Sequence, residues 1–113
     1  MKLPTATIIA PTKLTDYLLV WRAKDDKSIW LATAGYTIEN WQALSHDLRK
    51  LIVEAEAVPI EQTRFGQMFE IRGGLTGPNG RILAIRSFWM TEFETQQTKF
   101  VTLYPDKEHR DEI

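Results

Sequence analysis

The chain has 113 residues, of which 43% are hydrophobic and 26% charged, with 14 lysines and arginines against 15 aspartates and glutamates. This length fits one domain, and this apolar share is enough for a buried core, so wholesale disorder is excluded. The lack of cysteine and the presence of only two histidines exclude a disulfide framework and leave a poor set of zinc ligands. A net charge of −1 argues against a protein that coats nucleic acid electrostatically, although a local basic patch is compatible with it.

No apolar run approaches the roughly 20 residues that a membrane helix needs. The opening Met1–Pro4 carries one charge and no long apolar stretch, unlike a secretory signal. We therefore expect a soluble, cytoplasmic protein in which residues 1–113 form a single domain. Its core should lie at about 6–105 and be followed by a polar tail at 106–113.

The first third of the chain predicts short elements. Residues 6–10 form a short apolar run that is compatible with an edge strand. Apolar side chains at i, i+3 and i+4 predict a helix over 13–20, with Pro11 close to its first turn. Residues 27–34 predict a second short helix, and Gly35 stands where a C-cap glycine belongs.

The clearest pattern is that of an amphipathic helix of about 17 residues. Thr37 is a plausible N-cap, Glu39 places negative charge in the first turn, and Pro59 lies beyond the end. The apolar stripe consists of Ile38, Trp41, Leu44, Leu48, Leu51 and Ile52.

The second half changes to the two-residue period of strands. Residues 67–76 and 81–90 flank Gly77-Pro78-Asn79-Gly80, and residues 100–104 form a third strand-like run. The Pro-Asn-Gly order suits a three-residue loop, a type I turn closed by Gly80 in the left-handed conformation.

The length of this loop fixes the register of the hairpin. A three-residue loop places Phe69 opposite Trp89 and Arg72 opposite Arg86. A two-residue loop would place Arg86 opposite Ile71 among apolar residues, so hydrophobic burial favours the longer loop. One face then carries Phe69, Ile71, Leu75, Leu83, Ile85 and Trp89, and the other Glu70, Arg72, Thr76, Arg86 and Phe88.

In the third run, Val101 and Leu103 should join the apolar face. Phe100, Thr102 and Tyr104 should then share the polar face with the two arginines. The expected fold is α+β, with N-terminal helices packed on one face of a C-terminal antiparallel β-sheet.

The polar face of this sheet is the best candidate for a functional site. Glu70 and Arg72 stand two apart on one strand, and Arg86 lies across from Arg72. Two facing arginines repel each other unless an anion lies between them or Glu70 compensates. A phosphate suits that geometry because each guanidinium can bind it with two hydrogen bonds. Thr102 lies on a neighbouring strand, and Lys27 could supply a further cation.

Other interpretations stay open for this face. Charged residues on the open side of an antiparallel sheet are usually just its solvated surface. Phe88, Phe100 and Tyr104, exposed among the charges, suit a protein partner as well as they suit base stacking. We interpret His46 as a surface helix residue, since the adjacent Asp47 points elsewhere.

Motifs from both halves occur together in this chain: Lys13–Leu19, Lys27, Gly35-Tyr36 with Glu39–Trp41, Gly66-Gln67, Leu75–Arg81, Arg86–Trp89 and Val101–Pro105. In this order they resemble an uncharacterised bacterial domain family found as small stand-alone proteins and at the C-termini of large polymorphic toxins. The sheet motifs are the more specific part of the resemblance.

That family is similar to the barnase–EndoU–colicin–RelE group of ribonuclease toxins, in which the open face of the sheet cuts RNA. The resemblance implies attack of the 2′-hydroxyl on the neighbouring phosphate, without a metal or other cofactor. Such a step needs a base, cations for the developing charge and an acid for the leaving oxygen. Carried over by position, Lys27 matches the family's lysine, and Arg86 and Thr102 match its sheet motifs; Glu70 and Arg72 are added from the predicted geometry.

The sequence thus predicts a toxin-like, metal-independent endoribonuclease with RNA as substrate and a small antitoxin or immunity protein as partner. Arg72 and Arg86 would hold the scissile phosphate, which Thr102 would help to position. Glu70 would act as general base or orienter, and Lys27 would stabilise charge or donate a proton. The alternative is a non-catalytic protein-interaction module of the same fold.

Overall fold

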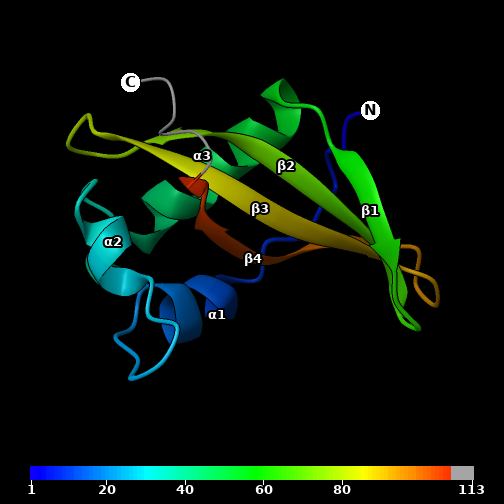
Figure 1. The fold of residues 1–113 in the computed structure, drawn as a ribbon, viewed down its shortest axis with the longest axis horizontal. Coiled ribbons are helices and arrows are strands. Elements are labelled where there is room, and N and C mark those ends of the chain that lie inside the picture. The colour runs from blue at the N-terminus through cyan, green and yellow to red at the C-terminus, as the bar shows by residue number, and fades with distance from the viewer. Residues whose placement is uncertain (108–113) are drawn as a thin grey trace.

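The computed structural model of the chain describes residues 1–107. Helices occupy the N-terminal half, and four strands form one antiparallel sheet in the order β1-β2-β3-β4 (Figure 1). The α+β prediction is therefore confirmed. Residues 108–113, which include His109 and most of the predicted polar tail, lie outside the described residues. The elements are α1 Pro11–Lys13, η1 Leu14–Leu18, α2 Ser28–Ala32, η2 Ile38–Asn40, α3 Trp41–Glu54, β1 Val58–Gln62, β2 Gly66–Thr76, β3 Ile82–Glu92 and β4 Thr98–Pro105.

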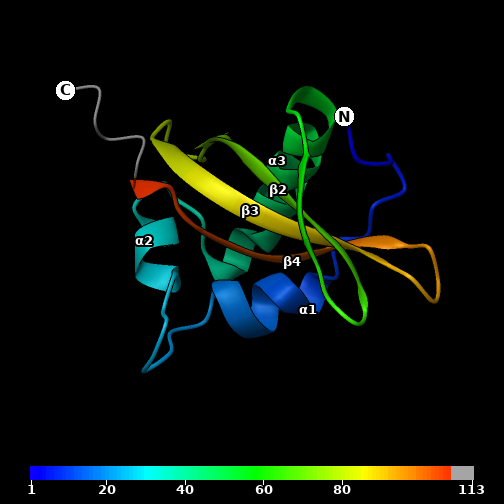
Figure 2. The same cartoon turned by 45° about the vertical axis from the view of Figure 1, so that its right-hand side comes forward.

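The long helix α3 covers the apolar face of the sheet (Figure 2). Together η2 and α3 span the predicted helix, although its first turn is a 3-10 turn in which Ile38 remains 42% exposed. The side chain of Asn40 accepts a hydrogen bond from the backbone N–H of Thr37 at 2.8 Å and so fixes this start. Gly73 lets α3 approach β2 closely, because a Cβ there would lie 2.6 Å from Leu51 Cδ1. The buried residues of the stripe are Leu44, Leu48, Leu51 and Ile52.

The N-terminal segment runs along the free edge of β4 (Figure 2). The backbone N–H of Ile8 donates to Thr98 O at 2.8 Å, and Phe100 N donates to Ile8 O at 2.8 Å. The predicted edge strand at 6–10 is thus reduced to an isolated parallel bridge. The next predicted helix forms as α1 and η1, and η1 is a π-helical turn that buries Leu14 and Leu18. No helix among residues 1–107 is both long and apolar enough to span a membrane.

The β2–β3 hairpin has the predicted turn and register. Gly80 has φ +88° and donates to Gly77 O at 2.9 Å, and Gly77 donates to Arg81 O at 2.9 Å. Arg72 pairs with Arg86, as the three-residue loop requires. The tip of this hairpin docks on the end of α2, where Asn79 donates to the carbonyl oxygens of Ala34 (backbone N–H, 3.2 Å) and Thr33 (side chain, 3.0 Å). The predicted apolar face is buried through Phe69, Ile71, Leu75, Leu83, Ile85 and Trp89.

Strand β1 is absent from the sequence-based prediction, which takes Pro59 only as a residue beyond the end of a helix. The strand is exposed along its whole length and pairs with β2 at Val58, Pro59 and Gln62, with an irregularity between the last two. Proline has no N–H to donate, but on an edge strand its nitrogen can point away from the sheet, where no hydrogen bond to a neighbouring strand is needed.

The predicted orientation of Phe100 is wrong. Phe88 pairs with Thr102, but the next residue, Trp89, pairs with Phe100, so Val101 is an extra residue that forms a β-bulge. The bulge reverses the alternation of side chains beyond it, and Phe100 therefore joins the buried face. It is 2% exposed, and its ring centroid lies 5.1 Å from that of Trp89.

Candidate functional site

The open face of the sheet carries two rows of side chains that run across β2, β3 and β4. One row is Arg72, Arg86 and Tyr104, and the other is Glu70, Phe88 and Thr102. Neighbouring strands lie about 4.8 Å apart, so these six residues form one continuous surface, which we call the polar sheet face. It contains every predicted site residue of the sheet except Phe100.

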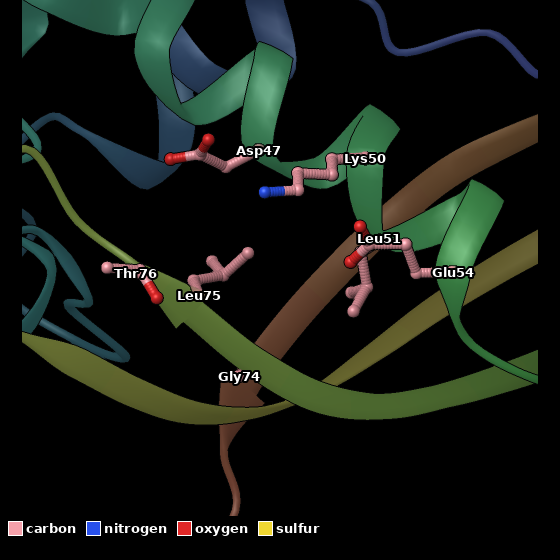
Figure 3. A pocket seen from close by; sticks show the side chains of 7 residues that line it. All are labelled: Asp47, Lys50, Leu51, Glu54, Gly74, Leu75 and Thr76. Atoms are coloured by element: carbon pink, nitrogen blue, oxygen red, sulfur yellow. The ribbon is translucent and has the colours of Figure 1, made fainter.

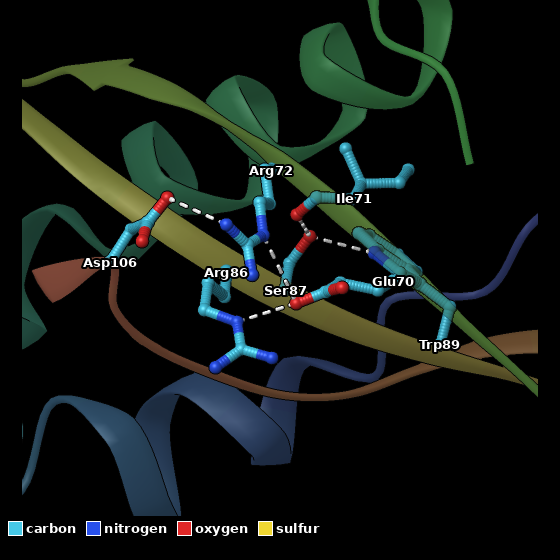
Figure 4. Close-up of polar contacts among 7 residues, drawn as sticks. All are labelled: Glu70, Ile71, Arg72, Arg86, Ser87, Trp89 and Asp106. Atoms are coloured by element: carbon cyan, nitrogen blue, oxygen red, sulfur yellow. Dashed lines mark hydrogen bonds and ion pairs between the residues drawn. The ribbon is translucent and has the colours of Figure 1, made fainter. Parts of the chain in front are cut away.

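Glu70 holds the two arginines of the polar sheet face (Figure 4). Its Oε2 accepts from Arg86 Nε at 2.5 Å and lies 3.5 Å from Arg72 Nε. Arg72 also forms an ion pair with Asp106, with 3.9 Å between Nη1 and Oδ2. The sequence allows either a bound anion or Glu70 to compensate the repulsion between the two arginines. In the structure, one carboxylate oxygen of Glu70 contacts both guanidinium groups and compensates it. This geometry suits Glu70 as the group that orients the arginines better than as a proton acceptor.

A buried hydrogen-bond chain fixes β2 and β3 beneath this surface. Ser87, which is fully buried, donates to Ile71 O at 2.9 Å and accepts from the indole N–H of Trp89 at 2.9 Å (Figure 4). Because each buried polar group here has a partner, the strands that carry Glu70 and Arg86 are held in one register.

Two aromatic rings lie beside the arginines. The rings of Phe88 and Tyr104 meet edge to face with centroids 5.7 Å apart, and Arg86 Cζ lies 5.5 Å from the Phe88 centroid. Tyr104 is 46% exposed. An exposed ring next to a guanidinium suits stacking of a nucleobase or of a side chain from a protein.

Lys27 lies at the β4 side of the polar sheet face and is 6% exposed. Its Nζ donates to the hydroxyl of Tyr17 at 3.2 Å and lies 4.5 Å from the ring centroid of Tyr104 and 5.2 Å from that of Tyr17. Among residues 1–107, no carboxylate oxygen lies within 4 Å of this ammonium group. A buried cation is costly unless it is paired, and two ring faces with one hydroxyl compensate only part of that cost.

The position of Lys27 follows from the turn before α2. Asp26 accepts from Arg22 N at 2.9 Å, Ser28 Oγ at 2.8 Å and Ile29 N at 3.2 Å. The Asp26 carboxylate is thereby occupied by the turn and does not pair with Lys27. Beside Lys27 and Tyr104, a hollow of about 320 Å³ reaches as far as Trp30.

Tyr17 and Thr102 complete this end of the site. Thr102 Oγ1 is buried and has no hydrogen-bond partner within the described part of the chain. It lies next to the Tyr17 hydroxyl and is the main cause that lowers the pKa of Tyr17, against the effect of partial burial; Lys27 and Arg22 lower it further. Arg22 Cζ lies 5.0 Å from the Tyr17 ring centroid. Tyr17 cannot be identified as a site residue from the sequence, because its spacing with Leu14 and Leu18 also fits the apolar stripe of a helix.

A separate, smaller hollow of about 130 Å³ lies between α3 and β2, on the opposite side of the sheet (Figure 3). Near it, the buried hydroxyl of Tyr36 donates to Asp47 Oδ2 at 2.5 Å, and burial together with Asp47 raises the pKa of Tyr36. His46 is exposed on α3, as predicted. None of these three features contacts the six residues of the polar sheet face. The lining residues are Asp47, Lys50, Leu51, Glu54, Gly74, Leu75 and Thr76.

Residues 2–107 match the family described as a domain of unknown function, DUF6883. The chain belongs to this family. The sequence resemblance to a domain family that extends over most of the chain agrees with this match. No curated protein matches the chain.

The fold recurs in a solved structure. A chain of the complex "Contact-dependent growth inhibition toxin - immunity protein complex from Klebsiella pneumoniae 342" superimposes with a TM-score of 0.67 at 14% sequence identity. The match covers 88% of this chain and 92% of that chain. At this identity the likeness is one of fold.

Proposed function

We propose that this DUF6883 domain is a toxin-like endoribonuclease that works without a metal ion and is neutralised by a small immunity or antitoxin protein. The observation that carries the proposal is the buried ammonium group of Lys27, which has no carboxylate partner in residues 1–107 and borders the arginine-bearing face of the sheet. A site of this kind is complete when an anion such as a phosphodiester occupies it.

The residues divide the work of the reaction. Arg86 and Arg72, oriented by Glu70, bind the non-bridging oxygens of the scissile phosphate. Lys27 stabilises the charge that develops on the phosphorane when the 2′-oxygen attacks. The buried hydroxyl of Thr102 positions the phosphate. These groups supply preorganised positive charge, which is the largest single contribution in many phosphoryl and acyl transfers.

Phe88 and Tyr104 give the site its preference for a flexible single strand. Stacking on an exposed ring contributes about 1–3 kcal/mol per base and requires that the base be unstacked from its neighbours. Single-stranded loops and ends of RNA meet that requirement.

The fold supports the partner proposal. Its likeness to a chain of a toxin–immunity complex agrees with a protein whose cationic face must be covered in the producing cell. An acidic partner would suit this face, because it would pair with Lys27, Arg72 and Arg86.

The test is cleavage of total RNA by the purified full chain, with and without EDTA. We expect cleavage in both conditions, fragments that end in a cyclic phosphate, and losses of about 100-fold or more in Lys27→Met and Arg86→Ala, as is typical when a charge-stabilising group is removed. Lys24→Met and Arg64→Ala are matched controls, because both residues are exposed and lie outside the site. RNA left intact by the wild type at high protein concentration would overturn the proposal.

The second candidate is a protein-interaction module of the same fold. It is favoured by the pairing of Glu70 with Arg86 and Arg72, since the arginines are compensated without any phosphate. In this case Arg86→Ala and Lys27→Met would weaken capture of a protein partner, and neither the wild type nor the variants would cut RNA.

A further inference from the structure

The hydroxyl of Tyr17, which borders the site, lies beside both the ammonium group of Lys27 and the hydroxyl of Thr102. It accepts a hydrogen bond from Lys27 Nζ at 3.2 Å, and the buried hydroxyl of Thr102 lies beside it. Thr102 is the largest cause that lowers the pKa of Tyr17, so the Thr102 side chain and Lys27 both favour the deprotonated phenol oxygen. Lys27 donates to that oxygen and cannot accept its proton, and within residues 1–107 the Tyr17 hydroxyl donates no hydrogen bond.

The Tyr17 side chain is also accessible. Tyr17 is half-buried, and together with Thr102 it lines a hollow of about 510 Å³ along the β4 edge. It belongs to the five-residue π-helical turn η1, in which Leu19 N donates to Leu14 O at 2.9 Å. Single π-helical turns are rare and occur frequently at functional sites.

The charges around Tyr17 favour loss of its proton. Lys27 donates to its oxygen, and Arg22 lies over its ring with 5.0 Å between Cζ and the centroid. The carboxylate nearest in sequence, Asp16, lines the same hollow but forms no hydrogen bond with Tyr17. Both cations stabilise a phenolate more than a phenol.

We propose that Tyr17 is the general acid of the reaction, which gives its phenolic proton to the leaving 5′-oxygen. This proposal rests on the endoribonuclease function stated above. The 2′-oxygen forms a bond to phosphorus and loses its proton to water, while the bond between phosphorus and the 5′-oxygen breaks. That 5′-oxygen leaves as a hydroxyl that carries the Tyr17 proton. The phenolate, held by Lys27 and Arg22, recovers a proton from water, so the step consumes no co-reactant.

This assignment separates the roles of Tyr17 and Lys27. The ammonium group of Lys27 stays charged throughout the reaction. It stabilises first the negative charge of the phosphorane and then that of the Tyr17 phenolate. From the sequence, Lys27 could either stabilise charge or donate the proton. A neighbouring tyrosine at hydrogen-bond distance makes the second role unnecessary.

The deciding experiment compares two RNA oligonucleotides of one sequence, cleaved by the wild type and by Tyr17→Phe. One substrate is ordinary, and the other has sulfur in place of the bridging 5′-oxygen at the scissile bond. A thiolate leaves without protonation, so it needs no acid. The phenylalanine variant keeps the ring that Lys27 and Arg22 contact and removes only the hydroxyl.

We expect Tyr17→Phe to lose about 100- to 10,000-fold in cleavage of ordinary RNA, the usual contribution of a general acid, and to cleave the sulfur substrate nearly as fast as the wild type. Equal losses on both substrates would overturn the proposal and indicate a structural role, as would full activity of the variant on ordinary RNA. Inactivity of the wild type on both substrates would instead overturn the endoribonuclease function itself. Thermal melting of both proteins checks that the fold is intact.

Discussion

Arg72 lies directly opposite Arg86 across the β2–β3 pair, and both guanidinium groups reach one oxygen of Glu70, at 3.5 Å and 2.5 Å. The side chain of Glu70 is 13% exposed, whereas those of Arg72 and Arg86 are 44% and 37% exposed. The carboxylate is therefore the buried centre of the cluster, and the arginines extend from it towards solvent.

Replacement of Glu70 by glutamine should lower the free energy of unfolding by about 1–2 kcal/mol, because a charge-assisted hydrogen bond is lost and the two guanidinium groups then repel each other. Urea denaturation measures the change. Glu94→Gln, at an exposed loop position, should leave stability unchanged. The loss should be smaller when Arg72 is alanine, since the repulsion is then absent. A Glu70→Gln protein as stable as the wild type would show that Glu70 does not compensate the arginines.

Replacement of Lys27 by methionine should separate stability from function. The ammonium group is 6% exposed and has no carboxylate partner in residues 1–107, so an apolar side chain of similar length avoids a desolvation cost. We expect the free energy of unfolding to rise by about 1 kcal/mol while RNA cleavage is lost. Urea denaturation and the cleavage assay, run on the same preparation, measure the two effects.

The matched control for this change is Lys24→Met, which removes an exposed lysine of the same turn. It should alter neither stability nor cleavage. A clear loss of stability in Lys27→Met would mean that the two tyrosine rings compensate the buried ammonium fully, and would remove the main argument that an anion belongs there.

The sequence predicts the β2–β3 hairpin in detail because two independent constraints coincide there. Pro78-Asn79-Gly80 limits the loop to a few geometries, and the alternation of apolar residues selects one of them. The placement of Arg72, Arg86 and Glu70 on one face follows directly. This part of the candidate site needed no knowledge of tertiary structure.

The parts that sequence reasoning missed depend on long-range packing. The residues around Val101 do not predict a bulge, because the local sequence allows Phe100 on either face of the sheet. Its burial depends on packing against the ring of Trp89, which lies on another strand. The exposed strand β1 lacks the apolar alternation that identifies a strand. Tyr17 and Lys27 are ten residues apart and meet only because the turn before α2 folds back over η1.

The titration of Tyr17 gives a prediction that does not depend on catalysis. Thr102 first, then Lys27 and Arg22, lower its pKa below the ordinary value of 10.0, whereas the pKa of Tyr36 is raised. In an ultraviolet titration of tyrosinate, the difference between the wild type and Tyr17→Phe should therefore have a midpoint below 10.0. Lys27→Met should move that midpoint upward. A midpoint at or above 10.0 would contradict the cationic environment.

The same shift predicts how stability depends on pH. Because the folded protein favours the phenolate, the wild type should gain stability relative to Tyr17→Phe as the pH rises through the folded pKa, and the gain should be complete above the unfolded value of 10.0. Below the folded pKa, ionisation of Tyr17 should contribute nothing to the difference between the two proteins.

The contact between the hairpin tip and α2 should control the position of Lys27. A Cβ at Gly77 would lie 2.0 Å from Ala34 O, so Gly77→Ala must push the hairpin away from the end of α2. We expect a loss of about 1–3 kcal/mol in the free energy of unfolding, together with weaker RNA cleavage at temperatures where the variant is still folded. Both are measured on one sample by urea denaturation and the cleavage assay.

Gly80→Ala is the matched control at the other end of the same loop. No atom of residues 1–107 lies within 4 Å of a Cβ at Gly80, but its φ of +88° strains any other residue, so this change should cost about 1 kcal/mol. It alters the turn without altering the contact with Ala34, and cleavage should persist. Equal loss of cleavage in both variants would indicate that hairpin stability, and not the docking of the tip on α2, determines where Lys27 lies.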